Sequence, residues 1–362
     1  MDSPQREEGE RVTLATIGDA LGVTGATVSN AFNRPDQLSA GLRKRILAKA
    51  HELGYRGPDP TARALSRGRT GLVGLLFTES LAFAFSDPGA MLMLHGVGAA
   101  CEDAEVGLVL LPLAPGAAHG LPQSRVSVDG YLVYSMPDTD PSVESVLVSG
   151  RPVVTIDQPQ VEGATFVGID DRRAAYLQLR HLLDLGHRRI GVLAYRLTPQ
   201  RREASHLVDQ ITDAAYRITR LRLAGYRDAL AERGLDTRDL IYQESGANDP
   251  VGGCAAAGRL LDQHPPPTAV LTDGDQLAIG ALRAARERNL HVPSQLSVIG
   301  TDDIPAAELT TPPLTTMAQP LFTKGLRAGH ELLRQIRGGS AAPPTILPVE
   351  LKHRGTTSPP PL

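Results

Sequence analysis

The pattern of apolar and polar positions across residues 14–53 has the period of an α-helix. The apolar positions of the first expected helix lie on one face: Leu14, Ile17 and Leu21. Gly22 suits the left-handed residue that ends a helix, and Thr24 and Ser39 have side chains that cap helix N-termini. The pattern therefore predicts three short helices. A four-residue turn with a glycine joins the first two, which is a helix-turn-helix arrangement.

After Gly71 the pattern changes to near-continuous apolar runs separated by amphipathic stretches. Such runs are typical of parallel strands that are buried on both faces. The expected strands are 72–77, 106–113, 130–135, 151–157, 189–195, 268–273 and 296–302. The expected helices are 88–104, 173–185, 220–233, 252–263, 275–289 and 322–337. This alternation predicts an α/β fold with parallel, doubly wound sheets, and its length favours two similar lobes.

A short segment separates the helical pattern of residues 14–53 from the strand pattern after Gly71. Asp59 and Pro60 suit the start of a helix, and Gly68 suits the residue just past its end. A helix of about eight residues is not stable alone in water, so we expect another surface to order it. The expected domains are an all-α helix-turn-helix headpiece at 12–57, a hinge linker at 58–70 and a two-lobed α/β domain at 71–362, with the chain crossing between lobes near 158–170 and 300–325.

The net charge of −3 conceals an asymmetry along the chain. Residues 1–70 carry 11 basic and 8 acidic side chains, and the remaining residues carry 26 basic and 32 acidic ones. A small basic module on a larger acidic body favours a nucleic acid partner electrostatically.

Cysteine usage and hydropathy argue against several classes of protein. Cys101 and Cys254 lie far apart and have no zinc-ligand spacing, so we expect a reducing, cytoplasmic setting with no metal and no cofactor. No segment approaches the roughly 20 consecutive apolar residues of a membrane span. The polar first residues lack the apolar core of a signal peptide, so we expect neither secretion nor a membrane partner.

Several motifs together resemble the LacI/GalR (lactose repressor/galactose repressor) family of transcriptional regulators. The stretch VTLATIGDALGVTGATVSNAFNRPDQLSAGLRKRILAKAHELGY is similar to the family's DNA-binding module, and PDPTARALSRGRT is similar to its hinge. The segments LGHRRIGVLA, RLAGYRDAL, LSVIGTDDIP and PPLTTMAQP resemble its effector domain. The resemblance covers almost the whole chain. It implies a periplasmic-binding-protein-like body, double-stranded operator DNA as a partner and allosteric control by a small molecule.

The second helix of such a module lies in the major groove and presents its outward residues to base edges. The outward residues expected here are Gly25, Ala26, Ser29 and Asn30. The Asn30 amide suits a bidentate contact with adenine. Gly25 and Ala26 stand where family members commonly carry longer polar side chains, so the operator sequence does not follow. Further DNA contacts, mainly to phosphates, are expected from the start of this helix and from nearby basic residues: Thr24, Thr27, Arg34, Arg43, Lys44 and Arg45.

The hinge segment carries the expected mechanism. The resemblance implies that Leu65 wedges between base steps in the minor groove, with positive charge around it from Arg63, Arg67 and Arg69. We expect this helix to form only on DNA and against its symmetry mate. An effector that respaces the two hinges would then melt them and weaken operator binding.

The resemblance also implies which side chains of the body bind the effector. Arg222 matches the family's effector-gripping arginine, Asp275 its second-lobe polar contact and Asp302 the aspartate that bonds ligand hydroxyls. The remaining expected contacts end a strand or follow the first one: Asp157, Phe83, Phe85, Ser86 and Asp87. Ionised carboxylates and a guanidinium form strong, directional hydrogen bonds with hydroxyls, so a sugar or a related compound is the expected effector.

The helix in PGAMLMLHGVGAACEDA is apolar nearly all round, which predicts a homodimer interface in addition to core packing. The competing hypothesis is an α/β enzyme, such as a metal-assisted hydrolase that uses the aspartate-rich segments TDGDQ and GTDD. A binding protein without a DNA function is a third possibility. The basic helices and the polar N-terminus argue against it, and none of the common hydrolase or phosphate-binding motifs supports the enzyme.

Overall fold

The chain divides into two compact units between Thr70 and Gly71, and each is considered separately below. The computed structural model describes residues 12–55, 57, 68–113, 126–195, 197–198, 203–208, 211 and 214–361. Within this part of the chain, no helix is long and apolar enough to cross a membrane.

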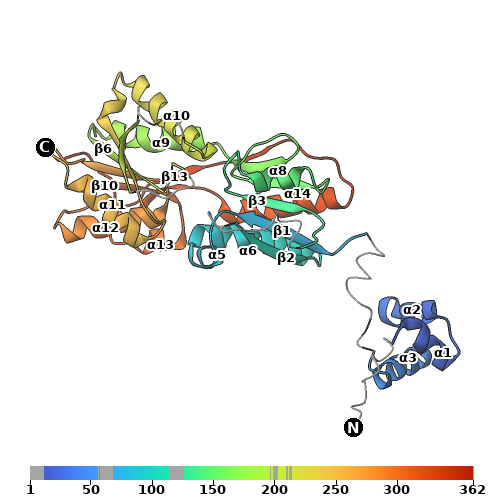
Figure 1. The fold of residues 1–362 in the computed structure, drawn as a ribbon. Helices are drawn as coiled ribbons and strands as arrows, with labels where there is room; N and C mark the ends of the chain where they lie inside the picture. Colours follow the sequence, from blue (N-terminus) through green and yellow to red (C-terminus); the bar gives the residue numbers. More distant parts are fainter. Residues whose placement is uncertain are drawn as a thin grey trace, which may run out of the picture. The chain divides into compact units, whose positions relative to one another are not determined.

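The first unit consists of short helices with capped N-termini (Figure 1). These are α1 (Leu14–Leu21), α2 (Gly25–Asn33), the 3₁₀ turn η1 (Pro35–Gln37) and α3 (Ala40–Glu52). The hydroxyls of Thr24 and Ser39 accept hydrogen bonds from the first turns of α2 and α3, and Gly22 ends α1 at φ = 66°. The inward positions form a small core of Ile17, Val28, Ala31, Ile46 and Ala50. The predicted helix-turn-helix arrangement is confirmed.

The second unit contains two sheets, and we call the part of the chain around each sheet a lobe. Lobe 1 is built on a fully parallel sheet with the strand order β12-β5-β4-β3-β1-β2. Its strands are β1 (Leu72–Phe77), β2 (Gly107–Pro112), β3 (Tyr131–Tyr134), β4 (Val153–Ile156), β5 (Thr165–Ile169) and β12 (Thr345–Leu347). Its helices are α5 (Leu81–Ser86), α6 (Pro88–Asp103), α8 (Pro141–Leu147) and α14 (Leu321–Ile336). Residues of α6 and α14 share one apolar core, and α8 contributes to another.

Lobe 2 has the strand order β13-β11-β10-β9-β6-β8-β7, with antiparallel strands at both edges. Its strands are β6 (Ile190–Ala194), β7 (Ser205–Leu207), β8 (Leu240–Glu244), β9 (Ala269–Thr272), β10 (Ser297–Asp302), β11 (Thr315–Ala318) and β13 (Glu350–Lys352). Its helices are α9 (Asp171–Asp184), α10 (Arg217–Glu232), the 3₁₀ turn η3 (Thr237–Asp239), α11 (Pro250–Leu261), α12 (Asp275–Glu287) and α13 (Pro305–Leu309).

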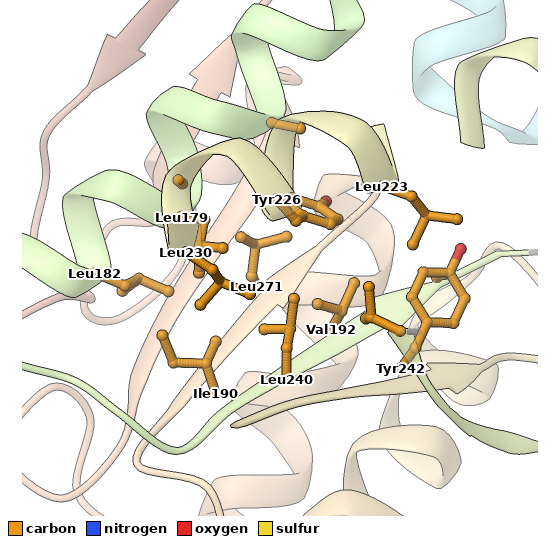
Figure 2. Packing of buried hydrophobic residues seen from close by; sticks show 14 of the residues in the cluster. Leu179, Leu182, Ile190, Val192, Leu223, Tyr226, Leu230, Leu240, Tyr242 and Leu271 are labelled. Atoms are coloured by element: carbon orange, nitrogen blue, oxygen red, sulfur yellow. The ribbon is translucent and has the colours of Figure 1, made fainter. Parts of the chain in front are cut away.

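The cores of lobe 2 lie between its sheet and two helix pairs. Figure 1 shows α9 and α10 on one side of this sheet and α11 and α12 on the other. In the core beneath α9 and α10, Leu223, Tyr226 and Leu230 pack onto strand residues such as Val192 and Leu240 (Figure 2). The predicted α/β architecture with doubly wound sheets is confirmed.

The chain passes between the lobes at three places. It crosses after β5, after β11, and again between β12 and β13. The sequence pattern did not predict the third crossing. It also missed β5, β7, β8, β11, β12 and β13, because these strands are short or contain polar residues and lack a long apolar run.

Helices α6 and α14 pack through glycines. A Cβ atom at Gly96 would lie 2.0 Å from the carbonyl oxygen of Phe322, and one at Gly325 would lie 2.0 Å from that of Met93. The two backbones therefore touch along one face of α6. On other positions of this helix, Met91 and His95 remain exposed.

Candidate functional site

A cavity of about 170 Å³ lies between the two lobes of the second unit. Lobe 1 supplies most of the apolar lining, formed mainly by Leu75, Phe77, Ala84, Met93 and Leu94, together with the acidic side chains of Glu79, Asp87 and Asp157. Lobe 2 supplies a polar wall, formed mainly by Tyr195, Arg222, Asn248, Asp273 and Asp302. The polar wall stands where parallel strands end, because Asp273 follows β9 and Asp302 ends β10. This is the edge at which open α/β folds bind ligands.

Arg222 is the only cation among the described side chains that line the cavity. It lies on α10, and its Nη1 donates to the carbonyl oxygen of Asp273 (2.9 Å) and lies 3.2 Å from that residue's Oδ1. Its Nε donates to Oδ1 of Asp171 (3.3 Å). Burial alone would lower the pKa of Arg222, but the two carboxylates raise it overall. Burial raises the pKa of Asp171 to about 6, against the opposing effect of Arg222.

Asp302 belongs to a chain of polar side chains that joins the lobes. Its Oδ1 accepts from Nε2 of Gln319, whose Oε1 accepts from Nζ of Lys324, and Lys324 also donates to Oδ1 of Asp157, each over 2.5 Å. Lys324 is fully buried. Burial, and then the nearby charge of Asp275, raise the pKa of Asp302 well above its ordinary value. The strand ends of both lobes are thus connected at the cavity, which Asp157, Gln319 and Asp302 line.

Two further hydrogen bonds cross the cavity. Tyr195 of lobe 2 donates from its hydroxyl to Oε1 of Glu79 (3.0 Å), and Asn248 donates from Nδ2 to Oδ2 of Asp87 (2.9 Å). The rings of Phe83 and Tyr195 are nearly parallel, with centroids 6.5 Å apart. Sequence reasoning missed Glu79, Tyr195 and Asn248. They lie in separate segments, and only the fold brings each to its partner.

The structure brings most of the expected effector contacts together: Phe83, Asp87, Asp157, Arg222 and Asp302 all line the cavity. It places three others elsewhere. Ser86 is exposed at the end of α5. Phe85 is 64% exposed on α5. Asp275 is fully buried inside lobe 2, where Oδ1 accepts from the Thr316 hydroxyl (2.6 Å) and Oδ2 from the Ile304 amide (2.9 Å).

These contacts give Asp275 a structural role. Its carboxylate accepts hydrogen bonds from the segment after β10 and from the neighbouring strand β11. The geometry therefore does not favour the expected direct contact with an effector. Burial raises the pKa of Asp275 to about 7. The family motif identified a polar residue beside the cavity but not the direction of its side chain.

In the first unit, the expected DNA-contacting residues lie on or beside α2 and on α3. Thr24 and Ala26 are exposed, and Gly25, Thr27, Ser29 and Asn30 are half-buried. The Ser29 hydroxyl accepts from Nδ2 of Asn33 (3.1 Å). Arg34, Arg43, Lys44 and Arg45 are exposed, although Nε of Arg43 donates to the carbonyl of Ala31 (3.3 Å) and so also braces α3 against α2. Arg63, Leu65 and Arg67 lie outside the described residues.

Comparison with known proteins gives consistent matches. The model of the periplasmic binding protein-like domain matches residues 179–357. The chain is 41% identical over 357 residues to the HTH-type transcriptional regulator Rv3575c of Mycobacterium tuberculosis, and the match covers 97% of this chain and 98% of that protein.

Solved structures are similar over nearly the full length. A LacI family transcriptional regulator from Corynebacterium glutamicum is 32% identical, with a TM-score of 0.73, and the match covers 96% of this chain and all of that one. The CelR–cellobiose complex is 28% identical with a TM-score of 0.66, and the lac repressor dimer bound to operator is 25% identical with a TM-score of 0.73. Both of these matches cover 96% of this chain and 100% of the other chain.

Proposed function

The chain belongs to the LacI family of transcriptional regulators, and we propose that it binds a pseudo-palindromic operator as a homodimer. Its affinity for the operator rises or falls when an uncharged, hydroxyl-rich molecule occupies the cavity between its lobes. The hydrolase alternative has no support among these relatives, which are named as regulators. We propose that the chain acts in the cytoplasm, where a bacterial regulator such as its relative from Mycobacterium tuberculosis reaches its DNA.

The observation that carries the effector proposal is the position of Arg222 beside Asp273 and Asp302 on one wall of the cavity. A guanidinium only donates hydrogen bonds, whereas an aspartate accepts them when it is ionised and can also donate when it is protonated. A hydroxyl both donates and accepts, so a compound with neighbouring hydroxyls can bond to Arg222 and to the two aspartates at once. An ammonium group offers no acceptor to Arg222, and a phosphate offers no donor to an ionised aspartate.

The charge of the cavity disfavours an anionic ligand. Five described acidic side chains line it, Glu79, Asp87, Asp157, Asp273 and Asp302, against one basic side chain. Burial raises the pKa of Asp87, Asp273 and Asp302, which means that further negative charge is already unfavourable there. We therefore propose a sugar or a related polyol without a phosphate group. The cellobiose complex of CelR agrees with this class.

For DNA, we propose that α2 enters the major groove and that Asn30 reads an adenine, with Thr24, Gly25, Ala26, Thr27 and Ser29 close to the bases or the backbone. Arg34 would contact a phosphate. We propose that residues 58–70 form the hinge, in which Arg63 and Leu65 enter the minor groove. The operator-bound dimer of the lac repressor agrees with a dimeric assembly, and the exposed positions of α6 are our candidate for its interface.

One experiment tests these proposals together. Full-length protein is used to select bound sequences from random duplex DNA, and the selection is repeated with a panel of sugars, polyols and nucleosides. We expect an enriched motif with two related halves, and a change in its enrichment with an uncharged hydroxylated compound. Absence of any enriched sequence would contradict operator binding. A response only to phosphate esters would contradict the proposed effector class while leaving the regulator function intact.

A further inference from the structure

The second unit begins at Gly71, and this residue is fixed by hydrogen bonds from two other segments. Its amide donates to Oδ2 of Asp129 (2.8 Å), and its carbonyl oxygen accepts from the amide of Gly107 at the start of β2 (2.8 Å). The next residue, Leu72, accepts from the amide of Asp129 (2.8 Å). Asp129 therefore holds two consecutive residues at the point where the chain enters lobe 1.

The bond from Gly71 to Asp129 has the features of a strong anchor. Asp129 is only 6% exposed, so its carboxylate accepts the amide proton away from bulk water, where charge-assisted bonds are strengthened. Gly71 has φ = 71°, a conformation that residues with a Cβ adopt only with strain. The backbone direction at Gly71 thus depends on a glycine and on one carboxylate that is distant in sequence.

The residue after Asp129 packs against α14. A Cβ atom at Gly130 would lie 2.9 Å from Cδ1 of Leu332 and 3.1 Å from Cδ1 of Ile336, both in the last two turns of this helix. At the other end of α14, Leu321 lines the cavity and Lys324 joins the polar chain that includes Asp302. At 1.5 Å per residue, the 15 steps from Leu321 to Ile336 span about 22 Å. One rigid helix therefore contacts both the cavity and the loop that anchors Gly71.

We propose that Asp129 is a positioning residue for DNA binding: it fixes Gly71, the residue from which the hinge leaves the effector domain, at the far end of the helix that begins at the cavity. This inference rests on the proposed function, because it matters only if residues 58–70 contact operator DNA. Asp129 is buried and does not line the cavity. It sets the direction in which residue 70 leaves the body, and hence the spacing of two hinges in a dimer.

The test uses the full chain and the operator obtained by the DNA selection. Asp129→Ala removes the acceptor for the Gly71 amide. Asp140→Ala is the matched control, because the carboxylate of Asp140 also accepts a backbone amide in lobe 1 (Ser142, 2.8 Å) but caps α8. We expect Asp129→Ala to bind the operator about tenfold or more weakly, with unchanged affinity for DNA of random sequence. We expect Asp140→Ala to keep the wild-type affinity for both.

Asp129→Asn keeps an acceptor oxygen and loses the charge, so its operator affinity should lie between those of wild type and Asp129→Ala. If the alanine variant does not fold, the operator affinity of Asp129→Asn provides the test. Hydrogen exchange should show faster exchange of the peptide that contains Gly71 and Leu72 in both Asp129 variants. Wild-type operator affinity in both variants, or equal losses on specific and random DNA, would overturn this proposal alone. Absence of sequence-specific binding by the unmodified chain would overturn the proposed function as well.

Discussion

Asn248 of lobe 2 donates a hydrogen bond from Nδ2 to Oδ2 of Asp87 in lobe 1 over 2.9 Å. The other oxygen of Asp87 caps α6 by accepting from the amide of Ala90 (2.7 Å). One carboxylate thus fixes the start of a helix that lines the cavity and also holds the opposite lobe. The contact joins side chains of the two lobes directly, so it contributes to holding the lobes together.

Replacing Asn248 by Asp should open the cavity. The substitution sets a second carboxylate against Asp87, which turns an attraction into a repulsion. Spin labels at Val148 and Val251, which are exposed on lobe 1 and lobe 2, report the separation of the lobes. We expect a longer distance in Asn248→Asp at pH 8 and a return toward the wild-type distance in mild acid, where one carboxyl takes up a proton. Asn248→Ala, which only removes the bond, should open less. Identical distance distributions in all three proteins would contradict this role.

Arg222→Met should destabilise the effector domain by about 3–5 kcal/mol, because it leaves Asp171 and Asp273 buried without their cation. Arg172→Met is a matched control, since Arg172 pairs with Asp228 on the surface of lobe 2 and surface pairs contribute little. Urea unfolding followed by circular dichroism measures both. Equal unfolding midpoints for the two variants would show that the buried cluster does not depend on Arg222.

The raised pKa of Asp275 predicts a pH dependence of stability. The pKa of this carboxyl is about 7 in the folded chain and near the ordinary value of about 4 in the unfolded chain. Between these values the folded state holds the additional proton, so the free energy of unfolding falls as the pH rises from about 4 to 7. Asp171, whose pKa is raised to about 6, acts in the same direction.

Asp275→Asn should weaken that dependence. The amide oxygen can still accept from Ile304, and its NH₂ group can donate to the Thr316 hydroxyl, so the local contacts are retained. Urea unfolding at pH 5 and pH 7.5 should show a smaller loss of stability in the variant than in wild type. If the variant loses as much stability between pH 5 and pH 7.5 as wild type does, the pH dependence arises from another group. Unchanged effector affinity in the variant would support the structural role of this residue.

Gly96→Ala should separate α6 from α14. Its Cβ would meet the Phe322 carbonyl at 2.0 Å, and backbone cannot move aside as a flexible side chain can. We expect a loss of about 1–3 kcal/mol in the free energy of unfolding. Gly98→Ala, two residues along the same helix, meets nothing within 4 Å and should be neutral or slightly stabilising, because alanine favours helix. A tolerated alanine at position 96 would mean that the helices do not touch there.

Leu65→Ala tests the proposed minor-groove wedge. A side chain that unstacks bases acts only on DNA that the protein bends specifically, so specific operator binding should weaken more than binding to random DNA. The test compares the dissociation constants for operator DNA and for random DNA, both measured at one salt concentration. Equal losses on both DNAs would argue against the wedge. Asn30→Ala provides a contrast, because it should relax selection at one base pair while the others keep their preference.

The sequence by itself determined the elements whose signals are local. Helix caps such as Thr24 and Ser39, the helix end at Gly22 and the long apolar runs depend on neighbouring residues, so they can be read without the fold. Arg222 and Asp302 were expected at the effector site from the family resemblance and not from such local signals, and the structure places both at the cavity. Short strands such as β11 were not predicted, because four residues are too few to show a periodic pattern of apolar positions.

Only the tertiary structure decided which side chains meet. Glu79, Tyr195 and Asn248 gain their partners across the lobes, and Asp129 reaches Gly71 from 58 residues away. Asp275 directly follows two residues that line the cavity, yet its carboxylate points into lobe 2, toward Thr316. The reason is that a side chain's direction and partners are set by strand order and by the passage of the chain between the lobes. Those long-range contacts leave no periodic trace in the sequence.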